Sequence, residues 1–243
     1  MRHVDSGTRN FSALKLLVLA PVALAMFLHH MSHRCFKKTC YNYFVLTTSK
    51  IIIGIDEAGR GPLAGPIAVG AFAVKASDIL KYFRGVKESK QLTEKQRDEW
   101  FRKIIEFTKR GEVAYAVSFS MSESIDSNGL TEVVRMSIDR CMKRLEKKGF
   151  AGLDSKIKLD GLLYAPHRYR YQETIIDGDS KESIIALASI CAKVLRDRHM
   201  KKLALKYPQY GFDVHKGYGT KKHYEAIKKY GILSIHRVSF LKR

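Results

Sequence analysis

Apolar residues occur along the chain in two kinds of segment, which differ in length and in period. The first kind is short and rich in β-branched residues, as in Ile51 to Ile55, where the run includes a glycine and ends at acidic residues. Such runs are typical of buried strands. By this criterion the sequence predicts strands at residues 51–55, 67–74, 114–120, 157–160 and 174–176.

The second kind of segment places apolar residues at helical spacing. Thr93, with Gln96 three residues later, has the signature of a capping box and predicts a helix that continues to about Phe107. Thr131 similarly opens a second helix, which is predicted by an apolar stripe. The stripe consists of Val134, Ile138, Cys141, Met142 and Leu145. The alternation of such strands and helices predicts one α/β core.

A third helix is predicted to begin at Ser180 and to be long and buried. Its apolar residues recur at Ile184, Leu187, Ala188, Cys191, Val194 and Leu195. Asp179 stands at its N-terminus, where the simplest role is an N-cap, supported by Glu182 three residues later. A capping aspartate can also face a metal ion, so both roles stay open, and Asp177 is the rival residue for the second.

The composition favours a single domain with a polyanionic partner. The chain has 243 residues, 45% of them hydrophobic, which is enough for one sizeable core. Its formal net charge is +20, and residues 51–243 still have 37 basic against 23 acidic side chains, a net charge of +14. Such a charge attracts phosphates, although a generally basic surface is the simpler explanation. The four cysteines form no CxxC pair and fit a reducing compartment.

The first 49 residues form a basic and apolar leader, which we expect to be disordered or dispensable. Leu16 to Leu28 is an uninterrupted apolar run, shorter than the roughly 20 residues that cross a bilayer. It is similar to the apolar region of a signal peptide, with Ala23 to Ala25 as a small-residue cleavage motif. An organellar transit segment and a true start at Met31 or later are the other interpretations.

The chemistry is concentrated where the first predicted strand ends. Asp56 and Glu57 are adjacent there, and two neighbouring carboxylates repel each other unless they share a cation or one takes a proton. The glycines at 59 and 61 bring bare backbone close to a ligand, and Arg60 between them suits phosphate oxygens. Together these residues indicate a metal-dependent phosphodiester site. A strand followed by a tight turn with surface charges is the alternative.

The string from Asp56 to Pro66, DEAGRGPLAGP, closely resembles the signature of the type 2 ribonucleases H, in particular ribonuclease HII. Further blocks of the same family follow in order, and Glu88 stands where the family usually has Asp. The blocks are Glu88 to Thr93, Leu159 to Gly161, Gly178 to Lys181, Ala188 to Val194 with Arg196 and Asp197, His215 to Thr220, and Ile235 to Arg237. The resemblance extends from about residue 50 to the C-terminus.

The resemblance implies a ribonuclease H-like fold, with a mixed central sheet flanked by helices and a C-terminal helical extension. It implies an endoribonuclease that hydrolyses the RNA strand of RNA–DNA hybrids and incises at single ribonucleotides in duplex DNA. Two Mg²⁺ or Mn²⁺ ions would activate the water and stabilise the leaving 3′-oxygen, giving 5′-phosphate and 3′-hydroxyl ends. The implied catalytic and metal-binding residues are Asp56, Glu57, Asp160 and Asp179.

The resemblance also implies a substrate-binding set. The backbone of Gly59, Arg60 and Gly61 would recognise the 2′-OH, the group that distinguishes RNA from DNA. Tyr218 matches a tyrosine that packs on the deoxyribose after the RNA–DNA junction, and an aromatic contact with Tyr224 is its simpler role. Two further residues, Lys90 and Lys216, would bind phosphates or remain solvated. We assign no chemistry to His215 or His236.

Two geometric expectations follow. If the first and fourth predicted strands are neighbours, Asp56 and Asp160 point into one crevice. Glu57 points to the opposite face of an ideal strand and would have to contribute from the turn.

A nucleic-acid-binding protein or another nuclease of the same fold is the alternative function. We expect the protein to be cytoplasmic, since export would separate a nuclease from its substrate. We also expect a monomer that needs no small-molecule cofactor. Organellar or membrane-associated placement through residues 1–30 is the alternative.

Overall fold

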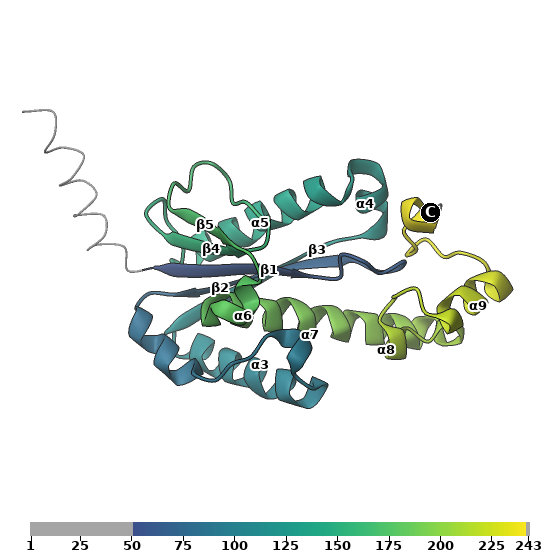
Figure 1. Ribbon diagram of the computed structural model, residues 1–243, viewed down its shortest axis with the longest axis horizontal. Helices are drawn as coiled ribbons and strands as arrows, with labels where there is room; N and C mark the ends of the chain where they lie inside the picture. The colour runs from purple at the N-terminus through teal and green to yellow at the C-terminus, as the bar shows by residue number, and fades with distance from the viewer. Residues whose placement is uncertain (1–50, 242–243) are drawn as a thin grey trace, which may run out of the picture. The chain divides into compact units, whose positions relative to one another are not determined.

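A five-stranded sheet in the order β3-β2-β1-β4-β5 organises the part of the chain that the computed structural model describes, residues 51–241 (Figure 1). The strands are β1 (Ile52–Ala58), β2 (Ile67–Val74), β3 (Val113–Ser120), β4 (Lys156–Asp160) and β5 (Gln172–Ile175). Each predicted strand is present, with bounds shifted by up to three residues. The predicted leader lies outside the described residues.

The sheet is mixed, as the resemblance implies. The pairs β1–β2 and β2–β3 are antiparallel, whereas β1–β4 and β4–β5 are parallel. In the register of β1 and β4, Ile55 is opposite Leu159. Asp56 and Asp160, the next residues along, therefore stand at neighbouring carboxyl ends of parallel strands, the edge where open α/β sheets bind ligands.

Helices cover both faces of the sheet, and a helical segment follows at the C-terminus. In Figure 1, α5 lies on one face, and α3 and α7 lie on the other. The α-helices are α3 (Glu94–Lys109), α4 (Ser122–Asn128), α5 (Leu130–Lys147), α6 (Gly178–Lys181), α7 (Ser183–Lys206), α8 (Phe212–His215), α9 (Lys221–Tyr230) and α10 (Val238–Leu241). Three 3₁₀ helices are η2 (Ser77–Phe83), η3 (Ser89–Gln91) and η4 (Pro208–Tyr210). None of the helices between residues 51 and 241 has both the length and the apolar character that a membrane crossing requires.

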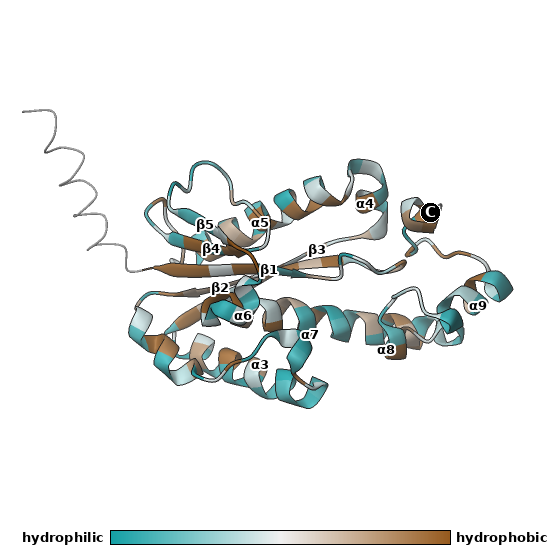
Figure 2. Cartoon of the chain, in the orientation of Figure 1, coloured by the Kyte–Doolittle hydropathy of each residue, from teal (hydrophilic) through white to brown (hydrophobic). Residues whose placement is uncertain are grey.

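The sequence pattern explains the layers. The apolar stripe predicted for the second helix is buried in α5 and packs on one face of the sheet with Ile53 and Ile55. Figure 2 shows the same division, with apolar colour concentrated in the strands and polar colour on the outward helix faces. Cys141 and Cys191 are free and buried, one in each of the two cores that flank the sheet.

Helix α7 packs directly against the backbone of the two central strands. A Cβ atom added at Gly54 would lie 2.1 Å from the carbonyl oxygen of Ile184, and one added at Gly70 would lie 2.4 Å from that of Ala188. Only glycine permits such an approach. This contact fixes the position of α7 beside the carboxyl ends of β1 and β4, where the acidic residues lie.

The predicted helix starts need correction. Thr93 forms the expected capping box with Gln96, but α5 begins at Leu130 after Gly129, so Thr131 is not its cap. The helix predicted from Ser180 is two helices, because Glu182 is extended and interrupts them. Asp179 therefore lies inside α6 and does not cap α7, and the side chain of Glu182 caps neither helix.

Long-range contacts explain this interruption. The N–H of Gly178 donates to Oδ1 of Asp160 at 2.7 Å, and Nζ of Lys158 lies 2.5 Å from Oε1 of Glu182. Both contacts fasten the segment to β4 before α7 begins. Helical periodicity alone does not contain this information.

Candidate active site

A hollow of about 240 Å³ opens where β1 and β4 end, and we call it the catalytic hollow. It brings together residues from the first strand, the Gly-Arg-Gly loop, η3, β4, α7 and the segment after α8. It is lined by Asp56, Glu57, Ala58, Gly59, Arg60, Gly61, Ser89, Lys90, Asp160, Ser189, Lys193 and Tyr218. Most of the residues that the sequence singles out thus converge on one place.

Asp56 occupies an environment that disfavours its negative charge. Only 4% of the residue is exposed, and burial raises the pKa of its carboxyl well above the usual range. The negative charges of Glu57 and Asp160 raise this pKa further, while a hydrogen bond with Ser189 lowers it. Oδ1 of Asp56 accepts the N–H of Glu57 at 2.7 Å. A carboxylate in this position is stabilised when a cation is shared with its neighbours.

Glu57 lies within β1 and lines the catalytic hollow. The expectation that it would have to reach the site from the turn after the strand is therefore wrong. Glu57 is opposite Val69 in the β1–β2 ladder, because β1 continues to Ala58. Its Oε1 accepts from Nε of Arg60 at 2.9 Å. Its Oε2 is buried and has no hydrogen-bond partner among the described residues. An unpaired buried carboxylate oxygen is costly, so this atom is available for a ligand.

Asp160 and Asp179 complete the acidic group. Asp160 is held by the N–H of Gly178, so the segment that bears Asp179 is attached to the end of β4. Burial raises the pKa of Asp179, and the charges of Asp160 and Glu88 raise it further, whereas Lys90 opposes them. Asp179 is 7% exposed and lies beside the catalytic hollow, outside its lining.

The residues fit a divalent cation by donor type and by the unsatisfied oxygen of Glu57. Four carboxylates are the hard oxygen ligands that Mg²⁺ and Mn²⁺ favour. In residues 51–241, however, no three His, Cys, Asp or Glu side chains already stand at metal-binding distances.

Two buried arginines contact the Gly-Arg-Gly loop, Arg237 by hydrogen bonds and Arg196 by packing. Arg237 donates to the carbonyl oxygens of Gly59 at 2.8 Å, Arg60 at 2.9 Å and Gly65 at 3.0 Å. Arg196 crosses the same loop, and a Cβ added at Gly59, whose φ is +93°, would lie 2.0 Å from its Nε. Both guanidinium groups are fully buried. Burial lowers the pKa of Arg237 to about 9, and the nearby charge of Arg196 contributes.

Tyr218 and Lys90 reach the catalytic hollow, but Lys216 does not line it. Tyr218 is 44% exposed, and its ring lies 3.8 Å from the Cβ position of Gly61, so it faces the Gly-Arg-Gly loop. Burial alone would lower the pKa of Lys90, but Glu88 and Asp179 raise it. The carbonyl of Lys216 accepts from Arg196 at 3.0 Å, and its Nζ contacts the carbonyl of Asp213.

Comparison with known proteins identifies the family. The model of the family described as ribonuclease HII matches residues 53–243. The chain belongs to the ribonuclease HII family. A ribonuclease HII of Caldicellulosiruptor bescii is 40% identical over 193 residues, which cover 79% of this chain and 87% of that relative.

Solved structures support the same fold. The ribonuclease H2 of Pyrococcus horikoshii OT3 is 28% identical, with a TM-score of 0.61 over 78% of this chain and 93% of that one. Bst-RNase HIII in complex with Mn²⁺ is 22% identical, with a TM-score of 0.59 over 79% of this chain and 67% of that one. The expected ribonuclease H-like fold is confirmed. As a ribonuclease HII, the chain is a divalent-metal-dependent endoribonuclease that acts on RNA–DNA hybrids.

The sequence does not predict a functional role for three residues that line the catalytic hollow of this ribonuclease HII, namely Ser89, Ser189 and Lys193. Ser89 and Ser189 join η3 to α7 through their hydroxyl oxygens, 2.7 Å apart, and Lys193 pairs with Asp197 at 2.8 Å. Ser189 and Lys193 are four residues apart in the stretch of α7 from Ile184 to Leu195, which is otherwise apolar. Polar residues at this spacing were the available signal, because one helix face then presents both to the site.

Proposed function

We propose that this ribonuclease HII incises duplex DNA at single embedded ribonucleotides, in addition to cutting the RNA strand of hybrids. Two divalent ions, Mg²⁺ or Mn²⁺, would be held by Asp56, Glu57, Asp160 and Asp179. The observation that carries the proposal is the buried, unpartnered Oε2 of Glu57 beside Asp56, whose pKa is raised. Bst-RNase HIII, whose fold this chain shares, is known in complex with Mn²⁺.

When bound, such ions supply Lewis-acid chemistry, which makes water a better nucleophile and stabilises charge on the leaving 3′-oxygen. The chain's own residues supply the geometry. Asp56 is held by the N–H of Glu57, and Asp160 is held by the N–H of Gly178, so both carboxylates keep a fixed orientation. Attack by water instead of the neighbouring 2′-OH gives products with 5′-phosphate and 3′-hydroxyl ends.

Recognition of the ribonucleotide would come from two elements that face each other across the catalytic hollow. The backbone of Gly59, Arg60 and Gly61 would bind the 2′-OH, since this loop is held in a fixed shape by Arg237. Tyr218 would pack on the sugar that follows the ribonucleotide. The exposure of its ring beside Gly61 supports this role.

Lys90 and Lys216 would bind backbone phosphates outside the cut position. The Lys90 side chain is 81% exposed at the catalytic hollow, although it lies 3.3 Å from Oε1 of Glu88. Lys216 would act from the segment that carries Tyr218. The cellular role that fits this activity is removal of ribonucleotides during DNA replication and repair, by a monomer in the cytoplasm.

The decisive experiment is incision of a DNA duplex that contains one ribonucleotide, by the purified full chain with Mg²⁺, Mn²⁺ or EDTA. We expect one metal-dependent cut on the 5′ side of the ribonucleotide, and no cut in an all-DNA duplex of the same sequence. Cleavage of a long RNA–DNA hybrid without any cut at the single ribonucleotide would reject the proposal and leave a hybrid-only enzyme.

A further inference from the structure

A second hollow of about 310 Å³ adjoins the catalytic hollow. Arg60 lines both hollows, so they form one continuous surface across its side chain. We call it the flanking hollow. It is lined by Arg60, Thr131, Val134, Arg135, Ile138, Leu162, Leu163 and Tyr164.

The flanking hollow presents apolar surface to solvent at the end of β4. Leu162 is 82% exposed and Tyr164 is 61% exposed, and both follow within four residues of Asp160. Val134 and Ile138, which are 3% and 1% exposed, form its floor on α5. A single exposed leucine is ordinary, but an exposed leucine and tyrosine over an apolar floor beside a catalytic site form a surface that a ligand can cover.

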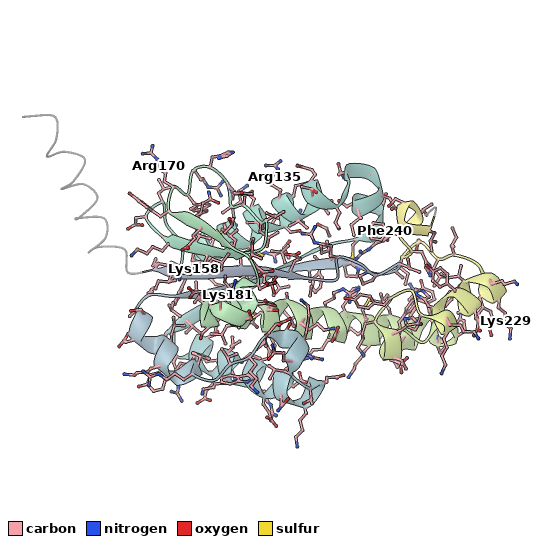
Figure 3. All side chains as sticks on the ribbon, viewed as in Figure 1. Arg135, Lys158, Arg170, Lys181, Lys229 and Phe240 are labelled. Atoms are coloured by element: carbon pink, nitrogen blue, oxygen red, sulfur yellow. The ribbon has the colours of Figure 1, made fainter. Side chains whose placement is uncertain are left out.

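Two arginines stand at the rim of the flanking hollow, each paired with a glutamate outside its lining. The side chains of Arg60 and Arg135 are 51% and 65% exposed, and none of the eight lining residues is acidic. Figure 3 shows Arg135 on the outward side of α5. Its Nε and terminal nitrogen lie 2.8 and 2.6 Å from the carboxylate of Glu132. Exposed ion pairs of this kind contribute little free energy, so a phosphate can compete for the guanidinium.

We propose that the flanking hollow binds the sugar–phosphate backbone of the substrate duplex, on one side of the cut position. Leu162 and Tyr164 would cover sugar faces, and Arg135 would bind a phosphate. The flanking hollow is continuous with the catalytic hollow and has two guanidinium groups, those of Arg60 and Arg135, at its rim. Both features favour nucleic acid over an apolar protein segment as the ligand. This inference rests on the proposed function, because it assumes that the duplex lies across the catalytic hollow.

The test compares kcat and KM of the full chain and its Leu162→Ala/Tyr164→Ala variant on a duplex with one ribonucleotide and long arms. Loss of these apolar contacts should raise KM about tenfold and leave kcat within about twofold. The matched control is Leu205→Ala on α7, since Leu205 is 86% exposed and does not line either hollow. A KM equal to that of the control, or a fall in kcat alone, would overturn the proposal.

Arm length gives a second, independent readout. The KM penalty of the double variant should vanish when one of the two duplex arms is shortened, and persist when the other is shortened. A penalty that is the same for every arm length would mean that the variant acts on the fold, and the proposal would fail.

Charge is tested separately by Arg135→Ala, with Lys147→Ala at the far end of α5 as the control. Removal of one phosphate contact should reduce the slope of log Kd against log salt by about 1, and the control should keep the slope of the original protein. An equal slope in both variants would contradict the role of Arg135.

The failure of this inference is distinguishable from failure of the proposed function. Binding of the same duplex is measured in EDTA, where no cleavage is needed. If the unmodified chain binds but makes no cut, the proposed function fails, and the Kd values of the variants still decide whether the flanking hollow contacts the duplex.

Discussion

The side chains of His223 and His236 meet at their Nε2 atoms, 3.2 Å apart, and Nδ1 of His223 lies 2.9 Å from the carbonyl oxygen of Tyr218. A carbonyl oxygen only accepts, so Nδ1 of His223 carries a proton and its Nε2 accepts from Nε2–H of His236. The N–H of Leu233 then donates to the bare Nδ1 of His236 at 2.8 Å. The Leu233 carbonyl, 3.2 Å from the same nitrogen, is a contact without a hydrogen bond. Two neutral rings thus support the backbone of Tyr218.

Acid should destabilise this pair. Burial lowers the pKa of His223 from 6.5 to about 4 and also lowers that of His236. The unfolded chain therefore binds more protons between these values, and stability must fall as the pH drops from about 6.5 to about 4. Over this pH range we expect the free energy of unfolding, measured with urea, to fall by on the order of 1 to 3 kcal/mol more in the original protein than in the His223→Gln variant. The exposed His167→Gln variant is the control and should keep the full pH dependence; a His223→Gln profile that parallels it would contradict the prediction.

Arg237 should not tolerate lysine. Its guanidinium serves the carbonyl oxygens of Gly59, Arg60 and Gly65 in one plane, which a lysine ammonium cannot match. We expect Arg237→Lys to lower stability by about 1 to 3 kcal/mol, since buried carbonyls lose their donors. Thermal unfolding measures this loss. The exposed Arg170→Lys variant should unfold at the same temperature as the original protein. Equal unfolding temperatures of the two variants would show that the hydrogen bonds of Arg237 do not stabilise the loop.

Sequence patterns were sufficient for parts of the fold whose determinants are local. The Thr93 capping box and the strands around Asp56 depend on neighbours within a few residues, and both are present. The division between α6 and α7 was missed, because it depends on contacts of Asp160 and Lys158 from another strand.

The site shows the same limit. The carboxylates lie at strand or helix ends, where local patterns and family blocks locate them. The hydrogen bonds of Arg237 to the Gly-Arg-Gly loop were not predicted, because Arg237 is 178 positions from Gly59. In sequence, a buried arginine also cannot be told from a surface arginine. Ser189 and Lys193 were hidden for a related reason, since helical period alone does not say which face of α7 meets the acidic residues.

Gly61 should be required for activity and dispensable for stability. A Cβ at this position meets only the ring of Tyr218, at 3.8 Å, which is an ordinary contact, so Gly61→Ala should fold normally. If the bare backbone has to approach the 2′-OH, the added methyl group should lower kcat/KM for a single ribonucleotide by about tenfold or more. Gly152→Ala, far from the catalytic hollow in the loop before β4, is the control. Unchanged cleavage by Gly61→Ala would argue against backbone recognition.

Asp56→Asn should abolish cleavage and preserve hybrid binding. The variant removes a buried charge that burial and Glu57 already disfavour, so without metal it should unfold at the same temperature or higher. Added Mn²⁺ should raise the unfolding temperature of the original protein more than that of the variant. Cleavage by Asp56→Asn in a nuclease-free preparation would refute the metal assignment, and equal stabilisation by Mn²⁺ would place the ion elsewhere.

Tyr218 offers the sharpest separation between recognition and general binding. Its ring is exposed beside Gly61, while its backbone is held by His223, so Tyr218→Ala should remove the ring without moving the chain. We expect incision at a single ribonucleotide to fall by about tenfold or more, with little change in the Kd for an all-DNA duplex. Tyr218→Phe should retain most activity if packing on the sugar is what matters. Tyr224→Ala, which removes a comparably exposed ring, is the control. Equal losses of incision and duplex affinity in Tyr218→Ala would instead assign the ring to nonspecific binding, because a junction-specific contact has no counterpart in all-DNA duplex.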